Sequence, residues 1–205
     1  MKIIGLSGKM QSGKTTVAEY LEDKGIGVIH GFSNGIKDAV VSLFRCNFMP
    51  YCLDRQSVKE SVHKCGKTHR EILQAVGLEM RNLWPDIWAE HWKHYMLTSR
   101  EPIIVPDVRF PNEVKAIQDM GGIVIRLTRN PVNSDDETET ALDECEQDTL
   151  CRSGKLDVFA RKVRVADDER EGILLCDFLV HNSDLSIDET NRACFEIAKE
   201  YINEP

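Results

Sequence analysis

The sequence predicts an α/β fold in which a five-stranded parallel sheet lies between layers of helices. Continuous apolar runs recur along the chain, and such runs are typical of strands that are buried on both faces. Stretches with helical periodicity separate these runs, which favours a doubly wound sheet. The first run is followed at once by a glycine-rich loop and a helix start. The length of 205 residues suits one domain (residues 1–205) with insertions.

Each strand and helix is predicted by a local signal. The expected strands are the apolar runs at residues 2–6, 26–30, 102–107, 123–127 and 173–180. Thr68 with Glu71, and Ser186 with Glu189, form capping-box patterns that start two of the helices. Two segments interrupt the alternation. The first is a mainly helical region at about residues 35–97, and the second is a charged insertion at about residues 130–172.

Residues 8–15 read Gly-x-x-x-x-Gly-Lys-Thr, a complete phosphate loop between a strand and a helix. Backbone N–H groups of such a loop surround the β- and γ-phosphates of a nucleoside triphosphate, which predicts ATP or GTP as a ligand. Lys14 supplies a positive charge, and the Thr15 hydroxyl can bind Mg²⁺. The expected triphosphate contacts are Gly8, Lys9, Gln11, Ser12, Gly13, Lys14, Thr15 and Thr16.

Composition excludes several classes of partner. The net charge of −8 and the pI near 5.3 argue against binding to nucleic acid polymers or to anionic membranes. No apolar run is long enough for a membrane span, and no signal-peptide pattern precedes the first strand. Seven cysteines cannot all pair, which favours the reducing cytoplasm. Cys46, Cys52, Cys65, His63 and His69 lie close in sequence, yet without a Cys-x-x-Cys pair we interpret the cysteines as free thiols and not as zinc ligands.

Several polar residues indicate a second phosphorylated substrate. Asp107 is the last residue of the predicted strand at residues 102–107. A carboxylate at this end of the strand could hold a Mg²⁺-bound water or orient a phosphoryl acceptor, or it could simply cap a helix. Arg109 follows two residues later and could grip a phosphate. Arg70 and Gln74 share one helix face, and Lys37 stands near a helix start. Lys37 and Arg70 could instead be ordinary surface charges, but together these groups favour phosphoryl transfer between two nucleotides.

A set of motifs recurs along the first two thirds of the chain, at residues 7–16, 31–33 with 36–37, 70–77, 84–88, 107–113 and 121–129. The Asp-Val-Arg-Phe-Pro-Asn-Glu string at residues 107–113 is the most distinctive of them. In these motifs the sequence resembles the phage-type deoxynucleoside monophosphate kinases of the P-loop kinase superfamily. The segment near residues 136–142 departs from the family pattern, which would have a His-x-Ser-Glu-like signature there.

This resemblance implies a three-layer P-loop kinase fold and transfer of the γ-phosphoryl group of ATP to a deoxynucleoside monophosphate. It implies Mg²⁺ held by Thr15 and Asp107, an approach of Asn182 to the adenine base, and a lid at about residues 130–172 with Arg129 as the first candidate cation. Lys14, Asp107, Arg109 and Arg129 would carry catalysis. The expected acceptor contacts are Lys37, Arg70, Gln74, Trp88, Arg109, Phe110 and Glu113, with Trp88 or Phe110 stacking on the base.

The resemblance is also compatible with a homodimer and with a cytoplasmic setting, which would be the host cytoplasm for a phage-encoded chain. Two alternatives remain open at this point. One is another small-metabolite P-loop kinase, such as a dephospho-coenzyme A kinase. The other is a non-catalytic nucleotide-binding switch or sensor, in which the second phosphate site would have lost its role.

Overall fold

The structure, a computed structural model, describes residues 1–128 and 176–203. The chain divides into two compact units. The first consists of Met1–Gly31 and Ser99–Pro205, and the second of Phe32–Thr98. The second unit corresponds closely to the helical region expected at about residues 35–97. The description of the chain as one kinase domain with two insertions stays a prediction.

The first unit is built on a five-stranded sheet whose neighbouring strands are all parallel. The strands are β1 (Ile3–Ser7), β2 (Val28–Ile29), β3 (Ile103–Val108), β4 (Ile123–Thr128) and β5 (Phe178–His181), in the spatial order β2-β3-β1-β4-β5. This topology confirms the predicted α/β class and agrees with a P-loop kinase fold.

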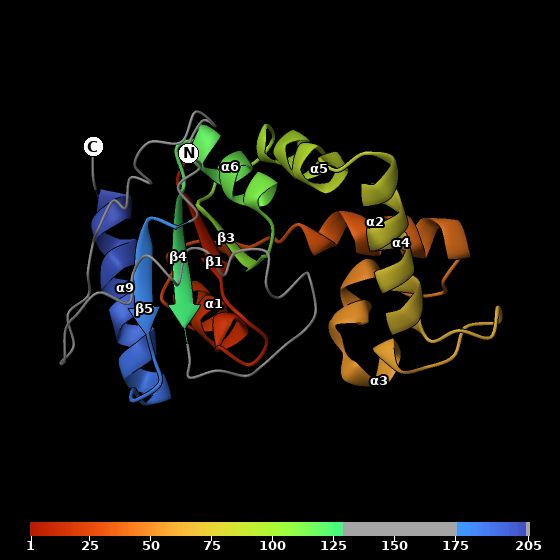
Figure 1. Cartoon of the computed structure of the whole chain (residues 1–205), viewed down its shortest axis with the longest axis horizontal. Coiled ribbons are helices and arrows are strands. Elements are labelled where there is room, and N and C mark those ends of the chain that lie inside the picture. The colour runs from red at the N-terminus through yellow and green to blue at the C-terminus, as the bar shows by residue number, and fades with distance from the viewer. Residues whose placement is uncertain (129–175, 204–205) are drawn as a thin grey trace. The chain divides into compact units, whose positions relative to one another are not determined.

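Helices cover both faces of this sheet (Figure 1). One face packs against α1 (Lys14–Asp23) and α9 (Ile187–Asn203), because Leu21 and Ile197 share a buried cluster with Leu6 of β1. The opposite face packs against α6 (Pro111–Asp119), since a Cβ atom at Gly5 would lie 2.7 Å from Ile117 Cδ1. The first unit therefore has the expected three layers.

The last strand begins later than the sequence predicts. The apolar run at residues 173–180 suggested a longer strand, but β5 starts at Phe178, and residues 173–175 lie outside the described residues. Asp177 explains the start. Its Oδ2 atom accepts a hydrogen bond of 2.7 Å from the Val124 N–H, so a side chain takes the place of a ladder partner immediately before the strand.

The second unit is helical. It contains α2 (Ser33–Phe44), the 3₁₀ helix η1 (Pro50–Asp54), α3 (Gln56–Lys59), α4 (His69–Leu83) and α5 (Ile87–Met96). Val40, Leu53 and Ile72 form its buried centre. Phe32 and Trp92 add an aromatic contact with ring centroids 4.8 Å apart. These contacts give the unit a core of its own.

Both predicted capping boxes are confirmed. The Thr68 hydroxyl oxygen accepts from the Glu71 N–H at 3.2 Å, and the Glu71 carboxylate accepts from the Thr68 N–H at 2.7 Å. Ser186 and Glu189 make the same reciprocal pair ahead of α9. The hydrogen bonds from the Thr68 backbone and side chain lower the pKa of Glu71. Glu71 therefore stabilises α4 at neutral pH and loses this effect as the pH falls through its lowered pKa.

We expect Thr68→Ala to lower the free energy of unfolding by about 1 kcal/mol, because the first turn of α4 loses its side-chain cap. Denaturant unfolding at neutral pH measures the change. Ser57→Ala removes an exposed hydroxyl from the same unit and serves as the control. Equal stabilities of the two variants would contradict the assigned role of the cap.

Candidate active site

The phosphate loop at residues 8–15 connects β1 to α1, and its backbone is strongly constrained. Gly8, Gln11 and Gly13 have positive φ angles of 138°, 65° and 96°. A Cβ atom at Gly8 would also lie 2.3 Å from the carbonyl oxygen of Leu127, so only glycine fits between the loop and the end of β4. Such a path turns successive N–H groups towards one concave side, where an anion can bind.

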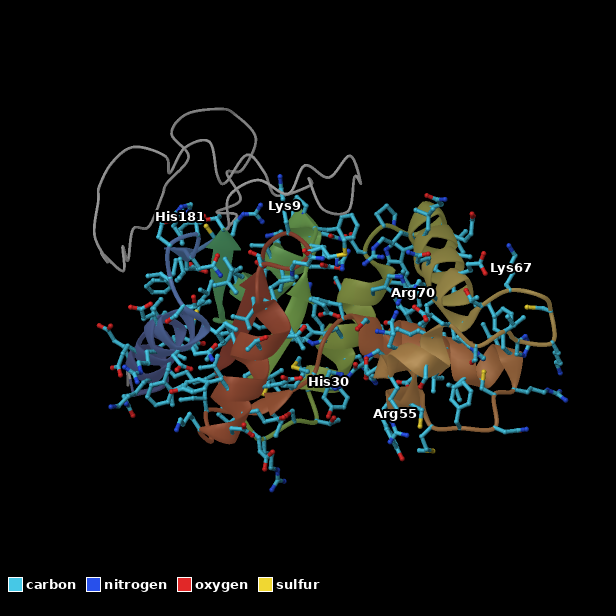
Figure 2. All side chains as sticks on the ribbon, turned by 90° about the horizontal axis from the view of Figure 1, so that it is seen from below. Lys9, His30, Arg55, Lys67, Arg70 and His181 are labelled. Carbon is cyan, nitrogen blue, oxygen red and sulfur yellow. The ribbon has the colours of Figure 1, made fainter. Side chains whose placement is uncertain are left out.

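Lys14 is the first residue of α1, and its side chain folds back over this loop. Its Nζ atom donates to the carbonyl oxygens of Gly8 at 2.5 Å and Lys9 at 2.7 Å. The ammonium charge thus adds to the positive end of the helix. Thr15 and Thr16 follow in the first turn and are exposed, so their hydroxyls are accessible to a ligand. Figure 2 shows Lys9 on the loop, at the same end of the sheet as His181.

The Asn182 side chain supports the phosphate loop through a hydrogen bond. The residue is 5% exposed, and its Nδ2 atom donates to the carbonyl oxygen of Ser12 at 2.9 Å. Its backbone N–H bonds to the Thr128 carbonyl oxygen, which ties the residue to the end of β4. The resemblance implied that Asn182 approaches the adenine base. The bond to Ser12 gives Asn182 a positioning role under the phosphate loop, and its approach to the base stays a prediction.

Asp107 owes its position to an irregularity in β3. The register changes from Gly5↔Val105 to Ser7↔Val108, so β3 carries one extra residue at this point. Pro106 has no N–H group for the ladder and is compatible with such a bulge. The Asp107 carboxylate then lies against Gly31, where a Cβ atom would be 2.4 Å from Oδ1 and 2.6 Å from Oδ2. Gly31 has ordinary backbone angles, so the constraint at this residue is purely spatial.

Arg109 and Phe110 lie on the turn between β3 and α6, and Glu113 holds that turn. Glu113 is 2% exposed, and its Oε2 atom accepts from the backbone N–H groups of Arg109 at 2.8 Å and Phe110 at 3.2 Å. The side chains of Arg109 and Phe110 are half-buried. Glu113 therefore positions the turn that carries Arg109 and Phe110, and its direct contact with the acceptor stays a prediction.

The helical unit holds the other predicted acceptor residues. Lys37 Nζ lies 2.7 Å from Asp54 Oδ1, and Arg70 Nη2 donates to Gln56 Oε1 at 2.9 Å. Gln74 lies one turn beyond Arg70 on α4 and is exposed. Lys37 and Arg70 are the cations among these residues. A ligand could replace Asp54 as the partner of Lys37 and Gln56 as the partner of Arg70.

Trp88 is placed differently from the other acceptor candidates. Its side chain is 4% exposed, and its indole N–H donates to the Gly77 carbonyl oxygen at 3.0 Å. This bond links α5 to α4 within the helical unit. Its burial favours a packing role over stacking on a base, which leaves Phe110 as the stacking candidate.

Lys59, which the sequence analysis missed, lies in the same unit at the end of α3. Burial lowers its pKa, and the charges of Lys37 and Arg70 lower it further, while Asp54 raises it. The helix has four residues, which is too short for hydrophobic periodicity to mark it in the sequence.

Arg129 and the predicted lid at about residues 130–172 lie outside the described residues.

Thr15 and Asp107 are the residues for which the sequence analysis predicts contact with Mg²⁺. Residues 1–128 and 176–203 contain no group of three or more His, Cys, Asp or Glu side chains arranged to hold a metal ion. Thr15 and Asp107 offer one hydroxyl and one carboxylate, and such oxygens suit Mg²⁺ that is bound mainly through substrate phosphates.

Cys46, Cys52 and Cys65 are free thiols. His63 and His69 are engaged by the backbone oxygens of Phe44 and Ser61.

We expect Asn182→Ala to weaken the binding of ATP and of inorganic tripolyphosphate by the same factor, about tenfold, because the Ser12 carbonyl loses its buried partner. Isothermal titration of both ligands measures this. Asn203→Ala, at the exposed end of α9, is the control. A loss confined to ATP would mean that Asn182 contacts the base.

Comparisons with known proteins agree with this geometry. No family model matches the chain. Among curated proteins, the chain is similar to a protein of Acanthamoeba polyphaga mimivirus named "Putative deoxynucleotide monophosphate kinase", with 33% identity over 152 residues. The matched region covers 66% of this chain and 78% of the viral protein. No helix in the described parts of the chain is long and apolar enough to cross a membrane.

The similarity to the viral protein, in identity and in the share of both chains that it covers, shows that the chain belongs to the deoxynucleotide monophosphate kinase family.

Proposed function

We propose that this protein transfers the γ-phosphoryl group of ATP to a deoxynucleoside monophosphate, which gives ADP and a deoxynucleoside diphosphate. Family membership supports a kinase. The observation that carries the finer proposal is the phosphate loop, in which the Lys14 ammonium lies on the carbonyl oxygens of Gly8 and Lys9. That charge lies beside the loop's N–H groups, where an ATP phosphate would bind.

In the proposed mechanism, Lys14 moves from the loop carbonyls to the oxygens of the transferring phosphate. These oxygens repel one another, and a fixed cation stabilises them in the transition state. The loop N–H groups orient the triphosphate, and Asn182 keeps the loop in place through Ser12. No covalent intermediate on the protein is needed, because alignment and charge stabilisation account for the catalysis.

Thr15 and Asp107 would hold Mg²⁺, and the ion would supply positive charge that offsets part of the phosphate charge. Gly31 contributes by leaving room for the Asp107 carboxylate. Glu113 contributes by fixing the backbone of Arg109 and Phe110. Gly31 and Glu113 therefore act through position, since they fix where Asp107, Arg109 and Phe110 lie.

For the acceptor, the candidates are assigned by their chemistry. Arg109 is proposed to grip the acceptor phosphate in fork geometry, and Phe110 to stack on the base. In the helical unit, Lys37 and Arg70 supply positive charge and Gln74 supplies an amide that could bond to the nucleotide. A monophosphate acceptor accounts for cations in addition to those of the phosphate loop.

A coupled assay for ADP release tests the proposal. The rate is measured with ATP alone, with each of the four deoxynucleoside monophosphates, and with dephospho-coenzyme A. The proposal predicts release that depends on at least one deoxynucleoside monophosphate. Release that depends on dephospho-coenzyme A alone, or ATP binding without release under any condition, would overturn it.

We expect Lys14→Ala to lower the rate of phosphoryl transfer by 10²-fold or more, on the order of 3 kcal/mol of lost transition-state stabilisation. Lys24→Ala removes the lysine at the C-cap of α1, away from the phosphate loop, and should leave the rate unchanged. Near-normal turnover of a folded Lys14→Ala protein would refute the active-site assignment.

We expect Gly31→Ala to displace the Asp107 carboxylate and to lower turnover by about 10²-fold, because a small misplacement of an orienting group is costly. Thermal unfolding shows whether the fold is kept. The additional change Asp107→Ala removes the clash, so the double variant should be no slower than Asp107→Ala alone. A Gly31→Ala enzyme with wild-type turnover would show that the position of Asp107 does not matter.

A further inference from the structure

His181 and Thr128 are joined by their side chains at the end of the sheet that carries the phosphate loop. The two residues are register partners at the carboxyl ends of β5 and β4, and His181 Nδ1 lies 3.0 Å from Thr128 Oγ1. His181 is exposed, whereas Thr128 is only 9% exposed. A hydrogen bond at one ring nitrogen fixes the orientation of an imidazole and decides whether the other nitrogen donates or accepts. The Nε2 atom of His181 is therefore a polar group with a fixed direction on an exposed residue.

The residues that flank this pair both contact the phosphate loop. On β4, the carbonyl oxygen of Leu127 is 2.3 Å from the place where a Cβ atom at Gly8 would lie. After β5, Asn182 donates to the carbonyl oxygen of Ser12 at 2.9 Å. Figure 2 shows His181 at the same end of the sheet as the loop. The imidazole is thus attached to the two strand ends on which the loop rests.

The order of the strands indicates which part of a nucleotide this imidazole would meet. The phosphate loop follows β1, with β3 on one side of that strand and β4 and β5 on the other. Asp107 and Arg109, which the proposed function assigns to Mg²⁺ and to the acceptor, belong to the β3 side. In phosphoryl transfer the attacking and leaving oxygens lie roughly in line, so the nucleosides of donor and acceptor extend in opposite directions. The nucleoside of ATP is therefore expected over the ends of β4 and β5.

The reach of a nucleotide fits this position. Neighbouring strands lie about 4.8 Å apart, so the ends of β1 and β5 are about 10 Å apart. The α-phosphate and the ribose separate the base of ATP from the phosphates in the loop, and they can span this distance. Base and ribose both carry hydrogen-bonding groups, so a fixed Nε2 atom finds a partner whether it donates or accepts.

We propose that His181 binds the nucleoside of ATP through its Nε2 atom, and that Thr128 is a positioning residue that holds the imidazole for this contact. The inference rests on the proposed function, because that function places the acceptor on the β3 side. It separates two tasks at the end of β5. Asn182 supports the loop that binds the phosphates, whereas His181 recognises the part of ATP beyond them.

The first test compares ATP with inorganic tripolyphosphate, which has no nucleoside, by isothermal titration. His181→Phe keeps an aromatic ring but removes Nε2. It should weaken the binding of ATP about three- to tenfold, the effect of one lost hydrogen bond, and leave the binding of tripolyphosphate unchanged. His94→Phe, at an exposed histidine on α5 of the helical unit, is the control. Equal ATP affinity of the two variants, or an equal loss for ATP and tripolyphosphate in His181→Phe, would overturn the proposal.

The second test uses Thr128→Val, which keeps the shape of the side chain and removes the hydroxyl. The proposal predicts a several-fold loss of ATP affinity, unchanged binding of tripolyphosphate, and no further loss when this change is added to His181→Phe. Losses for both ligands, or an effect that adds fully to that of His181→Phe, would contradict the positioning role. His181→Asn can still bond to Thr128 but has no polar atom at the Nε2 position. It should lose the same ATP affinity, and it carries the test if His181→Phe does not fold.

These measurements separate the inference from the proposed function. A loss of ATP affinity in His181→Phe, with no ADP release on any deoxynucleoside monophosphate in the wild type, would keep the nucleoside contact and overturn the kinase proposal. ADP release that depends on a deoxynucleoside monophosphate, with the same KM for ATP in His181→Phe and the wild type, would keep the kinase and overturn the contact. In the expected result, His181→Phe raises the KM for ATP and leaves the KM for the acceptor unchanged.

Discussion

The close approach of Gly8 to the end of β4 is the constraint on which the proposed triphosphate site depends. A Cβ atom at Gly8 would lie 2.3 Å from the Leu127 carbonyl oxygen, so the loop can rest on the strand only if this residue is glycine. Asn182 adds a second attachment from the end of β5 through its bond to Ser12. Because parallel strands present their carboxyl ends at one edge, a loop fixed to two strand ends is held rigidly at the place where nucleotides bind in such folds.

Lys14 and Lys37, one in each unit, differ in the groups that their side chains contact. In the first unit, Lys14 is held by uncharged carbonyl oxygens, which give it up more easily than a carboxylate would. In the helical unit, Lys37 is paired with Asp54, and a ligand must compete with that carboxylate. The proposed function uses this difference, because it has a triphosphate bind through many backbone groups and a monophosphate through a few side chains.

The sequence predicts the strands well where burial on both faces produces continuous apolar runs, as in β3 and β4. It also predicts the starts of α4 and α9, because a capping box is a local pattern. Features that depend on tertiary contacts could not be predicted. The start of β5 depends on the Asp177 carboxylate bonding to Val124, and the role of Asn182 depends on a bond across 170 residues of sequence. The bulge at Pro106 likewise requires the folded chain, although Pro106 inside a predicted strand was a usable signal.

The central claim is that the phosphoryl group passes from one bound nucleotide to another and not to water. ATP labelled at the γ-phosphorus tests this claim most directly, with the products separated after a single turnover in the presence of the preferred deoxynucleoside monophosphate. The account predicts that the label appears in the deoxynucleoside diphosphate. Label that appears in inorganic phosphate at the same rate with and without the acceptor would contradict it.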